Sequence, residues 1–91
     1  MKTFSLKISS PEGDLFCGEA VKLCVRASEG DLAVLADHIP FVSYVKPCDC
    51  RVELASGEGK TGRLDSGVLT VGKNEVILLS GDFSWRYIIV A

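Results

Sequence analysis

The residue best suited to chemistry is His38, the chain's only histidine. Pairing of His38 with a cysteine nucleophile is formally possible, but such a site would also need an orienting group and oxyanion donors, and no pattern in the sequence assigns these. The carboxylates of Glu29 and Asp31 could in principle take part in acid–base chemistry. Because they flank Gly30 in a turn-like stretch, they are better interpreted as solvated acceptors for the N–H groups of a turn. The sequence therefore assigns no catalytic residue.

Four cysteines are the other candidates for metal or redox chemistry: Cys17, Cys24, Cys48 and Cys50. Structural zinc sites usually contain pairs of cysteines separated by roughly two to four residues, and this chain has no such pair. Cys48 and Cys50 would lie on one face of a strand, which suits neither a relaxed disulfide nor a chelate. We therefore expect four free thiols, as in a reducing compartment, with no stoichiometric metal and no cofactor.

A phosphate-binding loop is a further candidate, because the stretch LASGEGKTGRL contains Gly59, Lys60 and Thr61 in succession. The full pattern needs a glycine at position 54, where this chain has Leu54, and a helix directly afterwards. Gly62 follows Thr61 at once instead. The stretch is therefore predicted to form a hairpin turn rather than to bind a nucleotide.

The composition of the 91-residue chain limits the remaining classes. This length makes one domain, over residues 1–91, and a hydrophobic content of 47% is typical of a folded globular protein. The net charge is −2 and the basic residues are scattered, so no basic stripe predicts nucleic-acid binding. No apolar run resembles a signal peptide or approaches the ~20 residues of a membrane helix. We expect a soluble, cytoplasmic protein that meets a membrane only through a partner.

The elements that would position these residues are short strands. Phe4, Leu6 and Ile8 alternate with polar residues, and Leu23 and Val25 do the same, which is the pattern of a strand with one buried face. Clusters of turn-forming residues separate such runs, and no segment is long and periodic enough to indicate a helix. The sequence therefore predicts an all-β fold of about ten short strands, packed as two sheets in a flattened sandwich or barrel.

The sequence around His38 resembles a known family. The stretch SEGDLAVLADHIPFVSYVKP, residues 28–47, is similar to the signature of the epsilon subunit of F-type ATP synthases, in which Glu-Gly, an apolar pair, His-x-Pro and Lys-Pro stand at the same spacing. The stretches FSLKISSPEGDLFCGEAVKLCV and LDSGVLTVGKNEVILL are also similar to segments of that family. The resemblance extends over roughly residues 2–80 without an obvious gap.

The chain departs from the family pattern at several loop positions. Ala36 and Asp37 replace the family's Pro-Gly before the histidine, and Ser66 replaces the first glycine of a Ser-Gly-Gly segment. Asp tolerates the left-handed backbone conformation better than most residues do, so these changes affect two loops more than the fold. The chain also ends where many epsilon subunits continue into a helical hairpin. It therefore resembles a short form that couples rotation but has no inhibitory helices.

The resemblance implies a non-catalytic subunit of the central stalk, which couples rotation of the c ring through the gamma subunit to ATP synthesis. The implied partners are gamma and the c ring, with no small-molecule substrate, at the cytoplasmic face of a bacterial membrane. Positions matching Ser10, His38 and Ser43 lie at or near the gamma-facing surface in the family. The position matching Asp31 lies in the loop that faces the ring, where a carboxylate would help to orient the subunit.

Two other classes remain open. The chain could be a free-standing β-sandwich interaction module that has changed its partner. It could also be a small enzyme or metal protein that uses His38 and the thiols. Under any of these hypotheses His38 could simply be a loop histidine that hydrogen-bonds to a neighbouring side chain.

The carboxy-terminal stretch GDFSWRYIIVA falls outside the family pattern. It concentrates aromatic and β-branched residues, which favour strands. Phe83, Trp85, Tyr87 and Ile89 would share one face of an extended segment. We therefore expect an added strand over about residues 84–90 along a sheet edge, where it would substitute for the packing of a helical hairpin.

Overall fold

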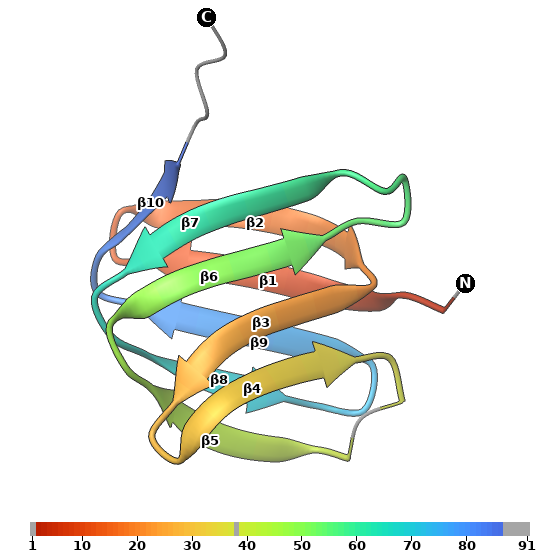
Figure 1. Ribbon diagram of the computed structural model, residues 1–91, viewed down its shortest axis with the longest axis horizontal. Coiled ribbons are helices and arrows are strands. Elements are labelled where there is room, and N and C mark those ends of the chain that lie inside the picture. The colour runs from red at the N-terminus through yellow and green to blue at the C-terminus, as the bar shows by residue number, and fades with distance from the viewer. Residues whose placement is uncertain (1, 38, 87–91) are drawn as a thin grey trace, which may run out of the picture.

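The computed structural model describes residues 2–37 and 39–86, and this part of the chain folds into ten β-strands (Figure 1). The strands are β1 (Phe4–Ser10), β2 (Gly13–Ala20), β3 (Lys22–Ala27), β4 (Gly30–Leu35), β5 (Phe41–Val45), β6 (Cys48–Glu53), β7 (Gly59–Leu64), β8 (Gly67–Val71), β9 (Glu75–Ser80) and β10 (Phe83–Arg86). The described residues form no helix that could cross a membrane. The predicted all-β class and number of strands are confirmed.

The strands form one continuous sheet that curls into two facing layers (Figure 1). In hydrogen-bonded order the sheet runs β10-β7-β6-β3-β5-β8-β9-β1-β2, and β4 pairs with β3 beside this path. One layer holds β10, β7, β6, β3 and β4, and the other holds β5, β8, β9, β1 and β2. The two layers are joined through β3. This strand pairs with β4 and β6 in its own layer, and its last residue, Ala27, pairs with Val45 of β5 in the other layer.

Alternate side chains of both layers fill the space between them. Leu6, Ile8 and Leu23 are fully buried, and Phe4 and Val25 are nearly so, as the alternation in the sequence predicted. Burial of one large apolar side chain is worth roughly 1.5–3 kcal/mol, which matters in so small a domain. The core continues through the other strands with Val34, Val45, Cys50, Val52, Leu64, Leu69, Val71, Val76 and Leu78.

The predicted hairpin around Gly59 is confirmed. Residues 54–58 connect β6 to β7, and the Leu54 N–H closes this turn by donating to the Glu58 carbonyl oxygen at 2.9 Å. The Gly-Lys-Thr sequence at residues 59–61 then lies within strand β7. It therefore lacks the helix start that holds a phosphate group in a phosphate-binding loop.

The carboxy-terminal stretch supplies β10, which pairs antiparallel with β7 at one edge of the sheet. The strand expected over residues 84–90 overlaps β10 at residues 84–86. Residues 87–90 lie outside the described residues.

Trp85 links β10 to β2, the strand at the other edge of the sheet. Its ring packs edge-to-face against Phe83 and Phe16, with centroid distances of 4.9 and 6.3 Å. Its Nε1 donates to the Leu15 carbonyl oxygen at 3.2 Å. The Lys60 ammonium covers the same aromatic cluster, 5.4 Å from the Trp85 ring centroid. Side chains thus connect the two edge strands of the curled sheet.

Candidate partner-binding surfaces

Two of the predicted partner-binding residues lie at one end of the sandwich. The β1–β2 and β3–β4 turns lie at one end, on the left of Figure 1, and the end of β4 and the start of β5 lie at the other. Ser10 is the last residue of β1 and Asp31 the second of β4, so both belong to the first end. His38 lies outside the described residues.

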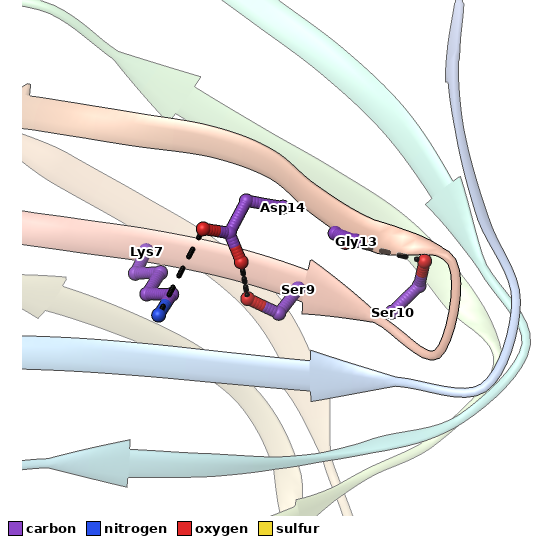
Figure 2. Close-up of polar contacts among 5 residues, drawn as sticks. All are labelled: Lys7, Ser9, Ser10, Gly13 and Asp14. Atoms are coloured by element: carbon purple, nitrogen blue, oxygen red, sulfur yellow. Dashed lines mark hydrogen bonds and ion pairs between the residues drawn. The ribbon is translucent and has the colours of Figure 1, made fainter.

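The side chain of Ser10 stabilises the turn between β1 and β2 (Figure 2). Its Oγ donates to the Gly13 carbonyl oxygen at 3.4 Å and accepts from the Glu12 N–H at 3.2 Å. Gly13 has a φ of 133°, which glycine adopts without the steric cost of a side chain. Ser10 also lines a hollow of about 700 Å³ together with Tyr44 and Leu79.

A short polar network follows this turn on the outer side of β1 and β2 (Figure 2). The Ser9 hydroxyl donates to the Asp14 carboxylate at 2.6 Å, and the Lys7 ammonium lies 3.8 Å from the other oxygen of that carboxylate. Ser9 is buried, so the bond satisfies a hydroxyl that has little access to water. The network lies beside the irregularity in pairing between Ile8 and Ser9 and holds the two strands together there.

Asp31 is held by an arginine that sequence reasoning did not identify. Arg26 and Asp31 pair across the β3–β4 hairpin, and the Arg26 Nε donates to the Asp31 carboxylate at 3.0 Å. The Asp31 side chain is 83% exposed, so the pair contributes little to stability but restricts where the carboxylate lies. The signal for this partner was present in the sequence, because a two-residue turn at residues 28–29 places position 26 opposite position 31.

Ser43 lies on the side of β5 away from the hollow. It pairs with the buried Leu69, is itself half-buried, and its Oγ donates to the Tyr44 carbonyl oxygen at 3.2 Å. Tyr44 is 74% exposed on the outer side of the strand and lines the hollow with Ser10. The structure therefore brings Tyr44, rather than Ser43, next to Ser10.

Exposed and half-buried apolar side chains cover the outer surface of β5, β8 and β9. We call this surface the apolar face, and it consists of Val42, Tyr44, Val68, Ile77 and Leu79. Its members are neighbours because Tyr44 pairs with Val68 and Val68 pairs with Leu79. A contiguous apolar surface on a folded domain is typical of an interaction site. The sequence analysis did not predict this surface. The signal was present, because β5 and β9 carry apolar residues on both faces, whereas a strand with one solvated face usually has polar residues on that face.

The four cysteines are free thiols in the structure. Burial raises the pKa of the Cys50 thiol to about 12, and the nearby Cys48 and Cys24 contribute to that rise. The Cys48 Sγ accepts a hydrogen bond from the Arg26 N–H at 3.3 Å. Among residues 2–37 and 39–86, no three His, Cys, Asp or Glu side chains are grouped so as to hold a metal ion.

The sequence of this chain is similar to that of ATP synthase subunits. Residues 3–86 match the family described as "ATP synthase, Delta/Epsilon chain, beta-sandwich domain". The chain is 38% identical over 84 residues to the ATP synthase epsilon chain of Clostridium novyi (strain NT) and 33% identical over 84 residues to the "ATP synthase epsilon chain, sodium ion specific" of Acetobacterium woodii. These alignments cover 92% of this chain and 64% and 63% of the relatives. The chain thus spans slightly less than two thirds of their length.

Solved structures with a similar fold come from the same kind of assembly. A chain of the mitochondrial ATP synthase of Euglena gracilis superposes with a TM-score of 0.86 at 19% identity, covering 91% of this chain and 53% of that one. A chain of the central stalk and c ring of the Tetrahymena thermophila mitochondrial ATP synthase gives a TM-score of 0.76 at 11% identity, covering 91% and 66%. At these identities the similarity establishes the fold alone.

Proposed function

Because this chain belongs to the ATP synthase delta/epsilon family, we propose that it is the β-sandwich domain of an epsilon subunit in the central stalk of an F-type ATP synthase. The domain carries out no chemistry itself. It transmits ion-driven rotation of the c ring, through the gamma subunit, to ATP synthesis. It lies at the cytoplasmic face of a bacterial membrane and meets that membrane only through the complex.

The apolar face supports the proposed contact with gamma and is the observation that carries the proposal. Val42 and Tyr44 are 69% and 74% exposed, and apolar area of this kind drives association when a partner removes it from water. The hollow beside Tyr44 can take up a protruding side chain of the partner, and Ser10 lies at its rim. We retain His38 and Ser43 as proposed members of the gamma-facing surface.

The end of the sandwich that bears the β3–β4 turn is the proposed contact with the c ring. Asp31 lies there with its carboxylate exposed and positioned by Arg26. A carboxylate opposite basic residues of the ring loops would set orientation and register more than affinity. The distance between the two contact surfaces is held constant because the strands that carry them belong to one hydrogen-bonded sheet.

The experiment is a binding measurement between this chain and a purified gamma–c-ring subcomplex. The double variant Tyr44→Ser with Leu79→Ser removes two apolar side chains from the apolar face. Since a large apolar side chain is worth roughly 1.5 kcal/mol or more when buried, the dissociation constant should rise at least about tenfold. The matched control is Leu35→Ser on β4, because Leu35 is exposed to the same extent as Leu79, 51%.

The control variant should bind like the unaltered chain. Equal losses in both variants would remove the apolar face from the proposal. If the unaltered chain fails to bind the subcomplex at all, the chain is instead a free-standing interaction module that has changed its partner.

A further inference from the structure

All four arginines of the chain lie on one outer surface of the sandwich: Arg26, Arg51, Arg63 and Arg86. They come from β3, β6, β7 and β10, which are consecutive strands of one layer (Figure 1). The strand register puts them there, since the side chains that alternate with them point into the core. Each arginine is exposed. We call this surface the arginine face.

The register also explains how the arginines are arranged. Arg51 pairs with Thr61, and Thr61 pairs with Arg86 on the other side of β7, so these two arginines share one row. Asp49 pairs with Arg63 in the next row. Neighbouring strands are about 4.8 Å apart, so the guanidinium groups are spread over a width of roughly 14 Å across the four strands.

The charge on this surface opposes the charge of the whole chain. The chain has a net charge of −2, yet the outer sides of these strands and of β4 carry the four arginines and Lys22 against three acidic residues, Asp31, Asp49 and Glu53. Two further carboxylates, Asp65 and Asp82, lie in the loops beside Arg63 at the end of this surface. The remaining surface is correspondingly acidic. A basic surface on an acidic protein creates an electrostatic potential that attracts anionic partners and favours binding at that surface.

Most of the donors on the arginine face are available to a partner. Arg26 forms a hydrogen-bonded pair with Asp31 at 3.0 Å. Asp49 instead lies between Arg63 and Arg86 at 3.5 and 3.4 Å, distances beyond the usual range for a charge-assisted hydrogen bond. The Arg51–Glu53 pair is longer still, at 3.7 Å. A guanidinium group has five N–H donors, so these loose pairs leave its fork open to an incoming carboxylate.

The arginine face also contains a hollow of about 620 Å³. Arg26, Arg51 and Arg63 line it, together with Asp31, Asp49 and Pro47. The hollow lies on the other layer from the apolar face, so a partner bound here would not compete with one bound to β5, β8 and β9.

We infer that the arginine face docks an acidic, extended segment of a partner polypeptide. A compact polyanion would contact only part of a row of guanidinium groups about 14 Å wide, and the carboxylates of Asp31 and Asp49 would repel it. An extended segment with carboxylates at intervals can place each one beside an arginine and leave gaps opposite the acidic residues. Arginine suits this task because its planar fork binds a carboxylate through two parallel hydrogen bonds. The inference does not depend on the proposed role in the central stalk.

The arginine side chains themselves report on this binding in an NMR titration. The ¹⁵N-labelled chain has four Nε–Hε signals, one for each arginine, which four single Arg→Lys variants assign. The probe is a synthetic peptide in which three glutamates alternate with serines, and the control peptide has glutamine in place of glutamate. We expect the Arg51, Arg63 and Arg86 signals to shift with the glutamate peptide at low salt and to shift less as salt is raised.

Two double variants that change the net charge equally distinguish binding at the arginine face from a general effect of the protein's charge. Arg51→Gln with Arg63→Gln should weaken binding of the glutamate peptide about tenfold or more, since each substitution removes charge-assisted hydrogen bonds. Lys7→Gln with Lys73→Gln should change it less than about twofold, because these lysines lie on β1 and between β8 and β9 in the other layer, and surface charges away from the contact act only through the screened field. Arg51→Lys with Arg63→Lys should fall between the two, because it keeps the charge and removes the fork.

Three results would overturn the inference. They are the absence of arginine shifts with the glutamate peptide, equal weakening by the two glutamine double variants, and equal shifts on addition of inorganic phosphate. Backbone amide spectra of each variant check that its fold is retained, so that a loss of binding can be attributed to the missing side chains.

Discussion

The indole N–H of Trp85 donates a hydrogen bond to the carbonyl oxygen of Leu15, although the two residues are 70 positions apart in the chain. Trp85 belongs to β10 and Leu15 to β2, the two strands at opposite ends of the sheet order. A side chain therefore joins edges of the curled sheet that no strand pairing connects in the part of the structure described here. The relationship makes β10 a structural part of the domain.

The first prediction tests this connection. Replacing Trp85 with alanine removes its ring contacts with Phe16 and Phe83 as well as the hydrogen bond. Since Trp85 is half-buried, the free energy of unfolding should fall by about 2–3 kcal/mol, somewhat less than for a fully buried tryptophan. Replacing Trp85 with phenylalanine keeps a ring and should cost about 1 kcal/mol. Urea unfolding measures both, and an unchanged midpoint for the alanine variant would show that β10 adds nothing to the fold.

The second prediction concerns Gly62, over which the Phe83 ring packs. A Cβ at position 62 would lie 2.4 Å from the Phe83 Cζ and 3.2 Å from the Ser84 carbonyl oxygen. Gly62→Ala must therefore displace the ring, and overpacking of this kind costs about 1–3 kcal/mol. Gly59→Ala is the matched control on the same strand, because its Cβ would meet only the Val52 carbonyl oxygen at 3.9 Å. If thermal unfolding shows equal losses for both variants, the close approach of the ring is not the cause.

Much of this fold could be predicted from the sequence because the relevant information is local. The alternation of Leu23 and Val25 with polar residues reflects a property of single strands, and the turn residues between the strands are equally local. The Arg26–Asp31 pair needs only the position of one turn. By contrast, the Trp85–Leu15 bond depends on how the whole sheet curls, and sequence patterns do not specify that.

The two proposed partner surfaces likewise combine features that the sequence shows with features that only the fold determines. The family pattern suggested Ser10 and Ser43 as partner-binding residues, but whether each side chain faces outward depends on how the strands are arranged, and Tyr44 rather than Ser43 lines the hollow with Ser10. The arginine face appears scattered in the sequence, since its arginines lie on β3, β6, β7 and β10, of which only β6 and β7 are consecutive in the chain. Only the order β10-β7-β6-β3 in the sheet brings those strands together.

The third prediction is a dependence of stability on alkaline pH. The Cys50 thiol is fully buried, and burial raises its pKa from 9.0 to about 12. Above pH 9 the unfolded chain loses this proton while the folded chain retains it, so the folded state binds more protons and its stability falls as pH rises. The stability that the raised pKa provides is present below pH 9 and is lost between about pH 9 and pH 12. The slope should approach about 1.4 kcal/mol per pH unit for this one group.

The variant Cys50→Ala isolates this contribution. Urea unfolding under reducing conditions at several pH values above 8 should show a shallower decline for the variant than for the unaltered chain. Identical slopes for the two proteins would contradict the assignment of the pH dependence to Cys50, whatever the difference in their absolute stability.

The fourth prediction concerns Asp37, which adopts the left-handed conformation with a φ of 69°. Asp is one of the few residues besides glycine that tolerate this conformation. Its carboxylate accepts a hydrogen bond from the Lys2 ammonium at 2.7 Å, and this contact raises the pKa of Lys2. Asp37 therefore combines a backbone role with an exposed ion pair, and three substitutions separate the two.

Asp37→Asn keeps the tolerance for the left-handed conformation and removes the charge, so it should leave the free energy of unfolding nearly unchanged at moderate salt. Asp37→Ala should lower it by about 1–2 kcal/mol, because a Cβ without a local hydrogen-bonding group is strained at this φ. Asp37→Gly should have a free energy of unfolding close to that of the unaltered chain. Glycine adopts this φ without strain, but the greater conformational freedom of its unfolded state offsets that gain. Chemical denaturation of the three variants ranks them. A loss in the asparagine variant as large as that in the alanine variant would mean that the Lys2 contact, and not the backbone, determines the choice of residue at this turn.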